Sequence, residues 1–229
     1  KVGIFSQNSL EWIYAGLGIT TAKAVLVPIY HNSTPDMAAY IVNHADLQLL
    51  FVQNATIFDL LISAGLKFPL LKYVVVIEGD DKENRNGLKF FNLDDLYHLG
   101  ENHRDSHPHL IEKLVETTTE EMVAQMLYTS GTTGRPKGVP LTYGNLIAST
   151  NDWLAINGPL VWPDSVDLHW LPNAHIFGWG SLGLGNILGF TSYLTNPLEV
   201  LKLMPEIKPH LFMSVPAYFE KLYQLSVTS

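Results

Sequence analysis

The chain of 229 residues contains no cysteine. Disulfide bonds and thiolate metal sites are therefore excluded. A reducing compartment fits this composition, because structural disulfides belong mainly to oxidising environments. We accordingly expect a cytoplasmic protein.

Positive charge is scarce. Lysine and arginine total 14 residues against 22 acidic ones, which gives a formal net charge of −8. A general nucleic-acid-binding protein normally carries a basic stripe, so we expect no nucleic-acid partner. A nucleotide such as ATP is not excluded, because its pocket needs only a few local donors.

Long hydrophobic runs are also missing. The most apolar stretch, residues 176–190, includes five glycines and Asn186. It is shorter than the roughly 20 residues that a membrane-spanning helix needs. This stretch predicts a buried, glycine-rich helix in a soluble chain.

Short apolar segments alternate with helical patterns in the first third of the chain. Asn8 or Ser9 can cap the first helix, and Thr34 followed by Pro35 is a typical helix start. Strand–helix alternation indicates parallel strands joined by helical crossovers, hence an α/β fold. The expected strands are residues 2–5, 25–29, 49–52 and 73–77, and the expected helices end near residues 22, 45 and 65.

The rest of the chain divides at a polar segment. Residues 78–122 are charged, and we expect an exposed excursion with one short helix at residues 93–99. Four histidines in or near that helix (98, 103, 107 and 109) match no metal-ligand spacing, so we expect no metal site. Regular structure should resume with strands at 123–128, 166–170 and 211–215 and helices at 142–153, 197–207 and 217–225. We therefore divide the chain into residues 1–77, 78–122 and 123–229.

The segment that carries chemistry is residues 128–138, Tyr-Thr-Ser-Gly-Thr-Thr-Gly-Arg-Pro-Lys-Gly. Glycines allow backbone N–H groups to turn toward one anion, short hydroxyls add donors, and lysine adds a mobile charge. It is not a Walker A loop, because Lys137 is followed by a glycine and Pro140 lies close behind, so no helix starts there. The alternative is a surface turn. The predicted phosphate-binding residues are Thr129, Ser130, Gly131, Thr132, Thr133, Gly134 and Lys137.

This segment closely resembles the signature loop of the adenylate-forming superfamily, which includes acyl-CoA synthetases, luciferases and peptide-synthetase adenylation domains. Residues 171–178, Leu-Pro-Asn-Ala-His-Ile-Phe-Gly, resemble the family's second conserved segment. In relatives, the ring at the position of His175 lies beside the acyl carboxylate and the adenylate. The resemblance thus implies an acyl and adenylate pocket at His175, Phe177 and Gly178. A buried histidine satisfied by a backbone carbonyl is the structural alternative.

The resemblance implies layered, Rossmann-like parallel sheets and an incomplete N-terminal domain of an adenylate-forming enzyme. It implies activation of a fatty acid by ATP to an acyl-adenylate, then transfer to coenzyme A, with Lys137 and His175 as catalytic residues. Family members also use Mg²⁺ and a mobile C-terminal domain. We find neither the Mg²⁺ ligand nor that domain in this sequence, so we expect the chain to be part of a longer protein and inactive alone. A fatty acyl-AMP or acyl carrier protein ligase, a non-catalytic nucleotide-binding module, and peripheral membrane contact remain open.

Overall fold

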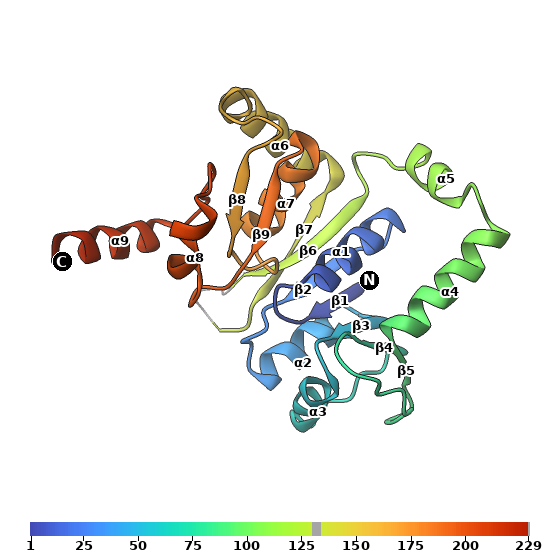
Figure 1. Cartoon of the computed structure of the whole chain (residues 1–229). Helices are drawn as coiled ribbons and strands as arrows, with labels where there is room; N and C mark the ends of the chain where they lie inside the picture. Colours follow the sequence, from blue (N-terminus) through green and yellow to red (C-terminus); the bar gives the residue numbers. More distant parts are fainter. Residues whose placement is uncertain (130–133, 229) are drawn as a thin grey trace. The chain divides into compact units, whose positions relative to one another are not determined.

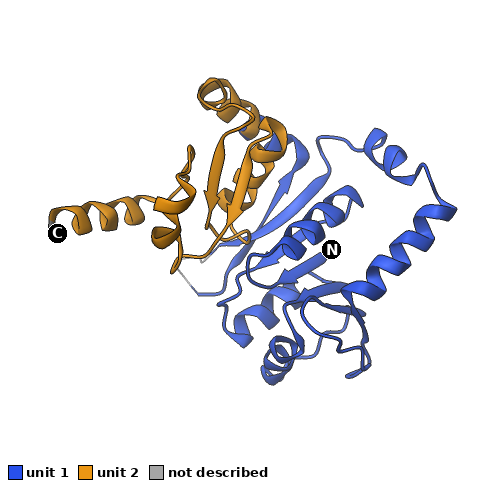
Figure 2. Cartoon of the chain, viewed as in Figure 1, with its two compact units in different colours: residues 1–149 blue, residues 150–229 orange. Residues whose placement is uncertain are grey.

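The computed structural model describes residues 1–129 and 134–228, with the side chain of residue 228 left out. The chain forms two compact units, Lys1–Ser149 and Thr150–Ser229 (Figure 2). Within the described ranges, no helix combines the length and the apolar character needed to cross a membrane.

Unit 1 is built on a seven-stranded sheet with the order β5-β4-β3-β1-β2-β6-β7 (Figure 1). All neighbouring strands are parallel except β6 and β7, which are antiparallel. The strands are β1 (Val2–Phe5), β2 (Leu26–Ile29), β3 (Leu49–Val52), β4 (Tyr73–Val76), β5 (Lys89–Asn92), β6 (Val123–Thr129) and β7 (Lys137–Thr142). The predicted α/β architecture with helical crossovers is confirmed, with one antiparallel edge strand added.

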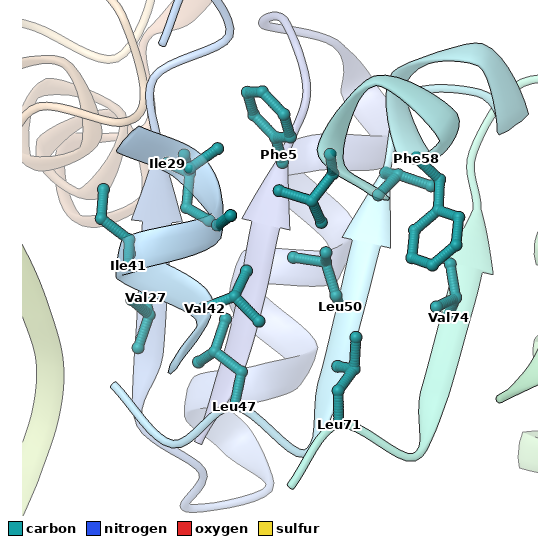
Figure 3. Close-up of a cluster of buried hydrophobic side chains, with 14 of the residues drawn as sticks. Phe5, Val27, Ile29, Ile41, Val42, Leu47, Leu50, Phe58, Leu71 and Val74 are labelled. Atoms are coloured by element: carbon teal, nitrogen blue, oxygen red, sulfur yellow. The ribbon is translucent and has the colours of Figure 1, made fainter. Parts of the chain in front are cut away.

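One face of this sheet is covered by α2 (Pro35–His44) and α3 (Ala55–Ser63). Strand residues such as Val27, Leu50 and Val74 point toward Val42 of α2 and Phe58 of α3 and form a buried apolar cluster (Figure 3). Central parallel strands need apolar residues on both faces, and these β-branched and aliphatic segments supply them.

The opposite face is covered by α1 (Leu10–Thr21) and α4 (Leu93–Ser106). Trp12 and Ile19 of α1 are buried. A small apolar hollow between α1, α4 and the strand residues Val2, Leu49 and Phe51 shows that both helices lie over this face. The sheet of unit 1 is thus a central layer between two helical layers.

Polar side chains begin these helices as the sequence predicts. The Ser9 hydroxyl accepts from the backbone N–H of Trp12, and the Thr34 hydroxyl accepts from that of Met37. Such caps satisfy N–H groups that have no partner within the helix. The start points of α1 and α2 therefore follow from local sequence.

The polar segment 78–122 contains more structure than the single short helix predicted for it. β5 extends the parallel sheet at its edge, α4 is 14 residues long, and α5 (Leu110–Glu116) follows. The side chain of Phe90 in β5 lies in the same cluster as Phe58, with ring centroids 5.0 Å apart. The prediction missed β5 because only its two central residues are apolar, between Lys89 and Asn92. No residue of α4 or α5 is buried, whereas Leu88, Phe90 and Asn92 of the same segment are.

Unit 2 contains a two-stranded parallel sheet, β8 (Val166–His169) and β9 (Thr191–Leu194). Its helices are α7 (Ile176–Leu188), α8 (Val200–Ile207) and α9 (Pro216–Thr228), while α6 (Tyr143–Asn157) and the short η1 (Gly158–Leu160) lie at and after the unit boundary. The prediction missed β9. It was wrong for residues 211–215, where only Leu211 forms an isolated bridge, to Asp167 of β8.

The burial of β5 gives a stability prediction. Phe90 is 4% exposed, whereas the neighbouring Phe91 points to the other face and is half-buried. We expect Phe90→Ala to lower the free energy of unfolding by about 3–5 kcal/mol, because the cavity lies in the main core. The matched variant Phe91→Ala should cost clearly less. Urea unfolding of both variants checks this, and equal losses would mean that β5 does not seal the core.

Candidate active site

The glycine-rich segment is held between two paired strands. β6 ends at Thr129 and β7 begins at Lys137, and these two residues lie opposite each other in the antiparallel pair. Ser130, Gly131, Thr132 and Thr133 lie outside the described residues. The hairpin therefore places Thr129 and Lys137, two of the predicted phosphate-binding residues, side by side at the base of the loop. β7 itself was missed by the sequence analysis, because Gly138 and Pro140 obscured the strand pattern.

The described end of the loop has a glycine-dependent backbone. Gly134 has a φ of +128°, a value that residues with a Cβ rarely adopt. The Lys137 side chain is exposed at the start of β7, and Pro136 is buried between these two residues. An exposed ammonium group beside a glycine turn can meet an anionic ligand.

Helix α2 contacts both flanks of the loop. His44 Nδ1 lies 2.7 Å from the Tyr128 hydroxyl, one residue before Thr129. On the other flank, the Arg135 guanidinium lies 5.1 Å from the centre of the Tyr40 ring, within the range of a cation–π contact. Burial raises the pKa of Tyr128 to about 12, with smaller contributions from Tyr40 and Asp46, so the hydroxyl keeps its proton. The sequence analysis did not find His44 or Tyr40, since nothing local links them to a segment more than 80 residues away.

A hollow of about 790 Å³ lies between α2 and the end of the loop. Its walls are polar, aromatic and apolar, and they come from α2, from Ala64 and Leu66 after α3, and from the end of the loop. The lining includes Asp36, Tyr40, His44, Gly134, Arg135 and Pro136.

In unit 2, His175 is the N-cap residue of α7. Its Nδ1 accepts a hydrogen bond from the backbone N–H of Phe177 at 3.2 Å. A neutral imidazole that accepts at Nδ1 carries its proton on Nε2. His175 is exposed, and the predicted alternative of a buried histidine is therefore wrong. The ring presents an N–H donor at the positive end of a helix dipole.

The neighbouring predicted residues differ in role. The Phe177 side chain is 37% exposed and apolar, so it can contact a ligand. Gly178 is buried, and a Cβ there would lie 2.1 Å from the carbonyl oxygen of Pro172. Gly178 thus allows the first turn of α7 to pack directly on the preceding Leu-Pro turn.

The remaining glycines of α7 are not equivalent. A Cβ on Gly185 would lie 3.1 Å from the Phe190 ring, whereas Gly180 and Gly183 have nothing within 4 Å. Gly189 ends the helix with a φ of +78°. Close packing explains some of these glycines, and two of them face open space.

A buried polar cluster lies behind the His175 turn and was not predicted. Asp167, His169, Asn173 and Ser181 are each at most 3% exposed. Burial raises the pKa of the Asp167 carboxyl to about 6, although hydrogen bonds from Ser192 and the Leu168 backbone oppose the shift. Burial lowers the pKa of His169, which its bond to Asn173 partly opposes. The alternation of polar and apolar residues in β8 is typical of a half-exposed strand, which hid this cluster from sequence analysis.

The structure groups the predicted site residues by unit. Thr129, Gly134 and Lys137 belong to unit 1, whereas His175, Phe177 and Gly178 belong to unit 2. Within the described part of the chain, no group of three or more acidic or histidine side chains is arranged to hold a metal ion.

Comparison with known proteins identifies the class of this fold and site. The family model described as AMP-binding enzyme matches residues 1–229. The chain belongs to the AMP-binding enzyme family, the adenylate-forming ligases that the loop motif indicated.

Curated relatives are acyl-CoA synthetases. Long chain acyl-CoA synthetase 7, peroxisomal, of Arabidopsis thaliana is 31% identical over 97% of this chain and 31% of its own length. Fatty acyl-CoA synthetase B of Dictyostelium discoideum is 29% identical over 97% of this chain and 33% of its own length. The chain thus spans about a third of the length of these relatives.

A solved structure with the same fold is ATP-bound MatB from Rhodopseudomonas palustris. It has a TM-score of 0.67 and 19% sequence identity, and the match covers 97% of this chain and 40% of that chain. At this identity the likeness establishes the fold.

The close approach at Gly178 gives a second stability prediction. Gly178→Ala should lower the free energy of unfolding by about 1–3 kcal/mol or more, because the Pro172 carbonyl is backbone and can move only with its turn. Gly180→Ala, in the same helix with open space around it, should raise stability by about 0.5–1 kcal/mol. Thermal unfolding of the two variants, compared with the parent protein, measures both changes in stability. A Gly178→Ala variant as stable as Gly180→Ala would contradict the packing.

The buried carboxyl gives a pH prediction. The folded pKa of Asp167, about 6, exceeds the unfolded value near 3.9, so the folded state binds this proton more tightly. Ionisation therefore lowers stability as pH rises from about 4 to about 6, by a total of ~3 kcal/mol. We expect Asp167→Asn to be more stable than the parent at about pH 8 and to lose that advantage near pH 4. Urea unfolding across this range checks it against Asp164→Asn, an exposed control; a gain that does not vary with pH would refute the assignment.

Proposed function

We propose that the protein containing this chain activates a fatty acid with ATP and then transfers the acyl group to coenzyme A. The supporting observation is the β6–β7 hairpin, which pairs Thr129 with Lys137 at the base of the family's signature loop. In the first step a carboxylate oxygen would attack the α-phosphorus of ATP. The bond between the α-phosphorus and the oxygen that bridges to the β-phosphate breaks. Pyrophosphate departs, and an acyl-adenylate is formed. In the second step the thiol sulfur would attack the acyl carbon and release AMP.

Lys137 is proposed to neutralise the departing pyrophosphate. Its ammonium group is exposed and lies across from Thr129, and Gly134 gives the adjoining backbone the freedom to approach phosphate oxygens. Stabilising charge where it develops is the main contribution a protein makes to such transfers. Ser130, Gly131, Thr132 and Thr133 are proposed to complete the phosphate cradle.

His175 is proposed to orient the carboxylate of the acid. Its Nδ1 is used by the Phe177 backbone, so the proton on Nε2 can be donated to a carboxylate oxygen. The N-terminus of α7 adds a favourable partial positive charge. Holding the nucleophile in line is worth several kcal/mol in reactions of this kind.

The fatty acyl substrate is supported by the relatives and by apolar surface near His175. Both curated relatives above are named as synthetases of long-chain or fatty acyl-CoA. Ile176 and Phe177 are each 37% exposed beside the histidine, whereas Leu182 and Leu184 are buried within unit 2. We propose Phe177 as a wall of the acyl pocket. We also propose that the enzyme works in the cytoplasm with peripheral membrane contact.

The family resemblance also implies Mg²⁺. The described residues contain no acidic cluster suited to it. Because the chain spans about a third of its relatives, we propose that the complete protein supplies the metal ligand and the parts that bind coenzyme A.

The test is pyrophosphate release by the complete protein with ATP and a panel of acids from acetate to palmitate, with and without coenzyme A. Lys137→Ala and His175→Ala should each reduce kcat/KM about 10²-fold or more, as expected for loss of a group that stabilises the transition state. Lys113→Ala and His98→Ala change exposed residues of α5 and α4 and serve as controls.

Each outcome of that test is informative. Thioester formation that peaks with long acids would support the proposal. Pyrophosphate release without thioester would favour an acyl-AMP or carrier-protein ligase instead. A folded protein that releases no pyrophosphate with any acid would overturn the proposal in favour of a non-catalytic nucleotide-binding module.

A further inference from the structure

The two faces of β8 have opposite character. Leu168 and Trp170 point into an apolar cluster that includes Val200 of α8. Asp167 and His169 point the other way, yet they are only 2% and 3% exposed. Burying polar side chains costs free energy unless hydrogen bonds compensate. The hydrogen bonds of His169 show how this cost is offset.

His169 bonds in two directions at once. Its Nε2 lies 2.8 Å from Asn173 Oδ1, in the turn that leads to His175. Its Nδ1 lies 3.2 Å from the Ser181 hydroxyl, in the second turn of α7. Since burial favours the neutral ring, the Nε2–H donates to Asn173 and Nδ1 is the acceptor.

Ser181 continues the contact toward the start of α7. Its hydroxyl also lies 2.8 Å from the Gly178 carbonyl oxygen, so its single proton is shared between that oxygen and Nδ1 of His169. His175 stands between these tethered points. Its backbone N–H donates to the Pro172 carbonyl, and its carbonyl accepts from the N–H of Trp179. The turn before His175 and the helix after it are therefore both tied to His169.

We propose that His169 is a positioning residue that fixes the orientation of His175 by tying Asn173 on one side and Ser181 on the other. The imidazole links β8 to the turn at Asn173 and to α7 at Ser181. Without the imidazole, Asn173 in the turn and Ser181 in α7 each lose a buried hydrogen bond. The His175 ring can then rotate away from the Phe177 N–H. An effect of His169 on catalysis rests on the role proposed for His175. The orientation of His175 by His169 does not depend on that role.

His169 does not take part in a hydrolytic triad, although a serine and an aspartate are near. In such a triad the two ring nitrogens face the nucleophile and the acid separately. Here Ser181 Oγ at 3.2 Å and Asp167 Oδ2 at 4.0 Å both approach Nδ1. All three side chains are also at most 3% exposed, so no substrate reaches them. The cluster acts through the position of its neighbours.

The experiment compares four variants in the complete protein. His169→Leu removes both hydrogen bonds, and His169→Gln retains an N–H donor toward Asn173. Ser181→Ala removes the hydrogen bond to His169 Nδ1 with a minimal change of volume. It tests the proposal if His169→Leu does not fold. His210→Leu is the matched control, because His210 also bonds to β8, at the backbone N–H of Val166 at the other end of the strand.

The first readout is the tautomer of His175, measured by long-range ¹H–¹⁵N correlations on histidine-labelled protein with the signal assigned by His175→Gln. The parent and His210→Leu should show the proton on Nε2. His169→Leu and Ser181→Ala should show both tautomers, and His169→Gln should restore most of the single form. An unchanged His175 tautomer in folded His169→Leu or Ser181→Ala would overturn the proposal.

The second readout is the kinetics of pyrophosphate release. We expect kcat/KM for the acid to fall about tenfold or more in His169→Leu, because small misplacement of an orienting group is costly, while KM for ATP changes less than twofold. A rise in KM for ATP as large as the fall in kcat/KM for the acid would indicate a general structural defect and count against positioning. If the parent protein forms no acyl-adenylate, the proposed function fails, and the tautomer measurement still decides the role of His169.

Discussion

A parallel sheet has to be covered on both faces, and this constraint arranges everything else in unit 1. Its central strands carry apolar side chains on both sides, and α2 and α3 cover one face while α1 and α4 cover the other. Helical crossovers then bring the carboxyl ends of β1 to β4 to one edge. β6 joins parallel to β2, so the signature loop leaves the sheet at that same edge. Ligand sites in open α/β sheets lie at the carboxyl ends of the strands for this reason.

The hairpin that carries the loop is attached to this sheet by a short pairing. β6 and β2 share one register pair, Leu26 with Gln125. The hydrogen bond between His44 and Tyr128 supplies a second attachment, close to where the loop begins. Gly138, opposite Tyr128, leaves room for the ring, because a Cβ there would lie 3.2 Å from it. The core thus sets the position of the hairpin through α2 as well as through the sheet.

Local sequence accounts for the elements that local physics decides. The limits of β1 and β3 follow from their apolar residues, and α2 begins after Thr34 because a hydroxyl cap precedes Pro35. Three edge or short strands, β5, β7 and β9, could not be predicted, because a strand of four to six polar or mixed residues is specified by its neighbour and not by its own pattern. Residues 211–215 are apolar like a strand, yet only Leu211 finds a partner.

The candidate site divides in the same way. Motif and chemistry were enough to propose Lys137 and His175 as site residues, since the proposal needs only their residue types and spacing. The residues that hold them could not be named, because His44 reaches Tyr128 across 84 positions and His169 reaches Ser181 from a strand that reads as half-exposed. Support of this kind depends on tertiary packing, which a single sequence does not display.

Both supports are hydrogen bonds of histidine, and for the buried His169 the choice has a physical reason. Ion pairs such as Lys82 with Asp95 lie at the surface, where they contribute little and are screened by salt. A neutral imidazole can donate from one nitrogen and accept at the other without bringing a net charge into the core. It therefore fixes two neighbours at once for a smaller desolvation cost than a lysine or arginine would incur. Burial lowers the pKa of His169, so the neutral ring is the form that the core favours.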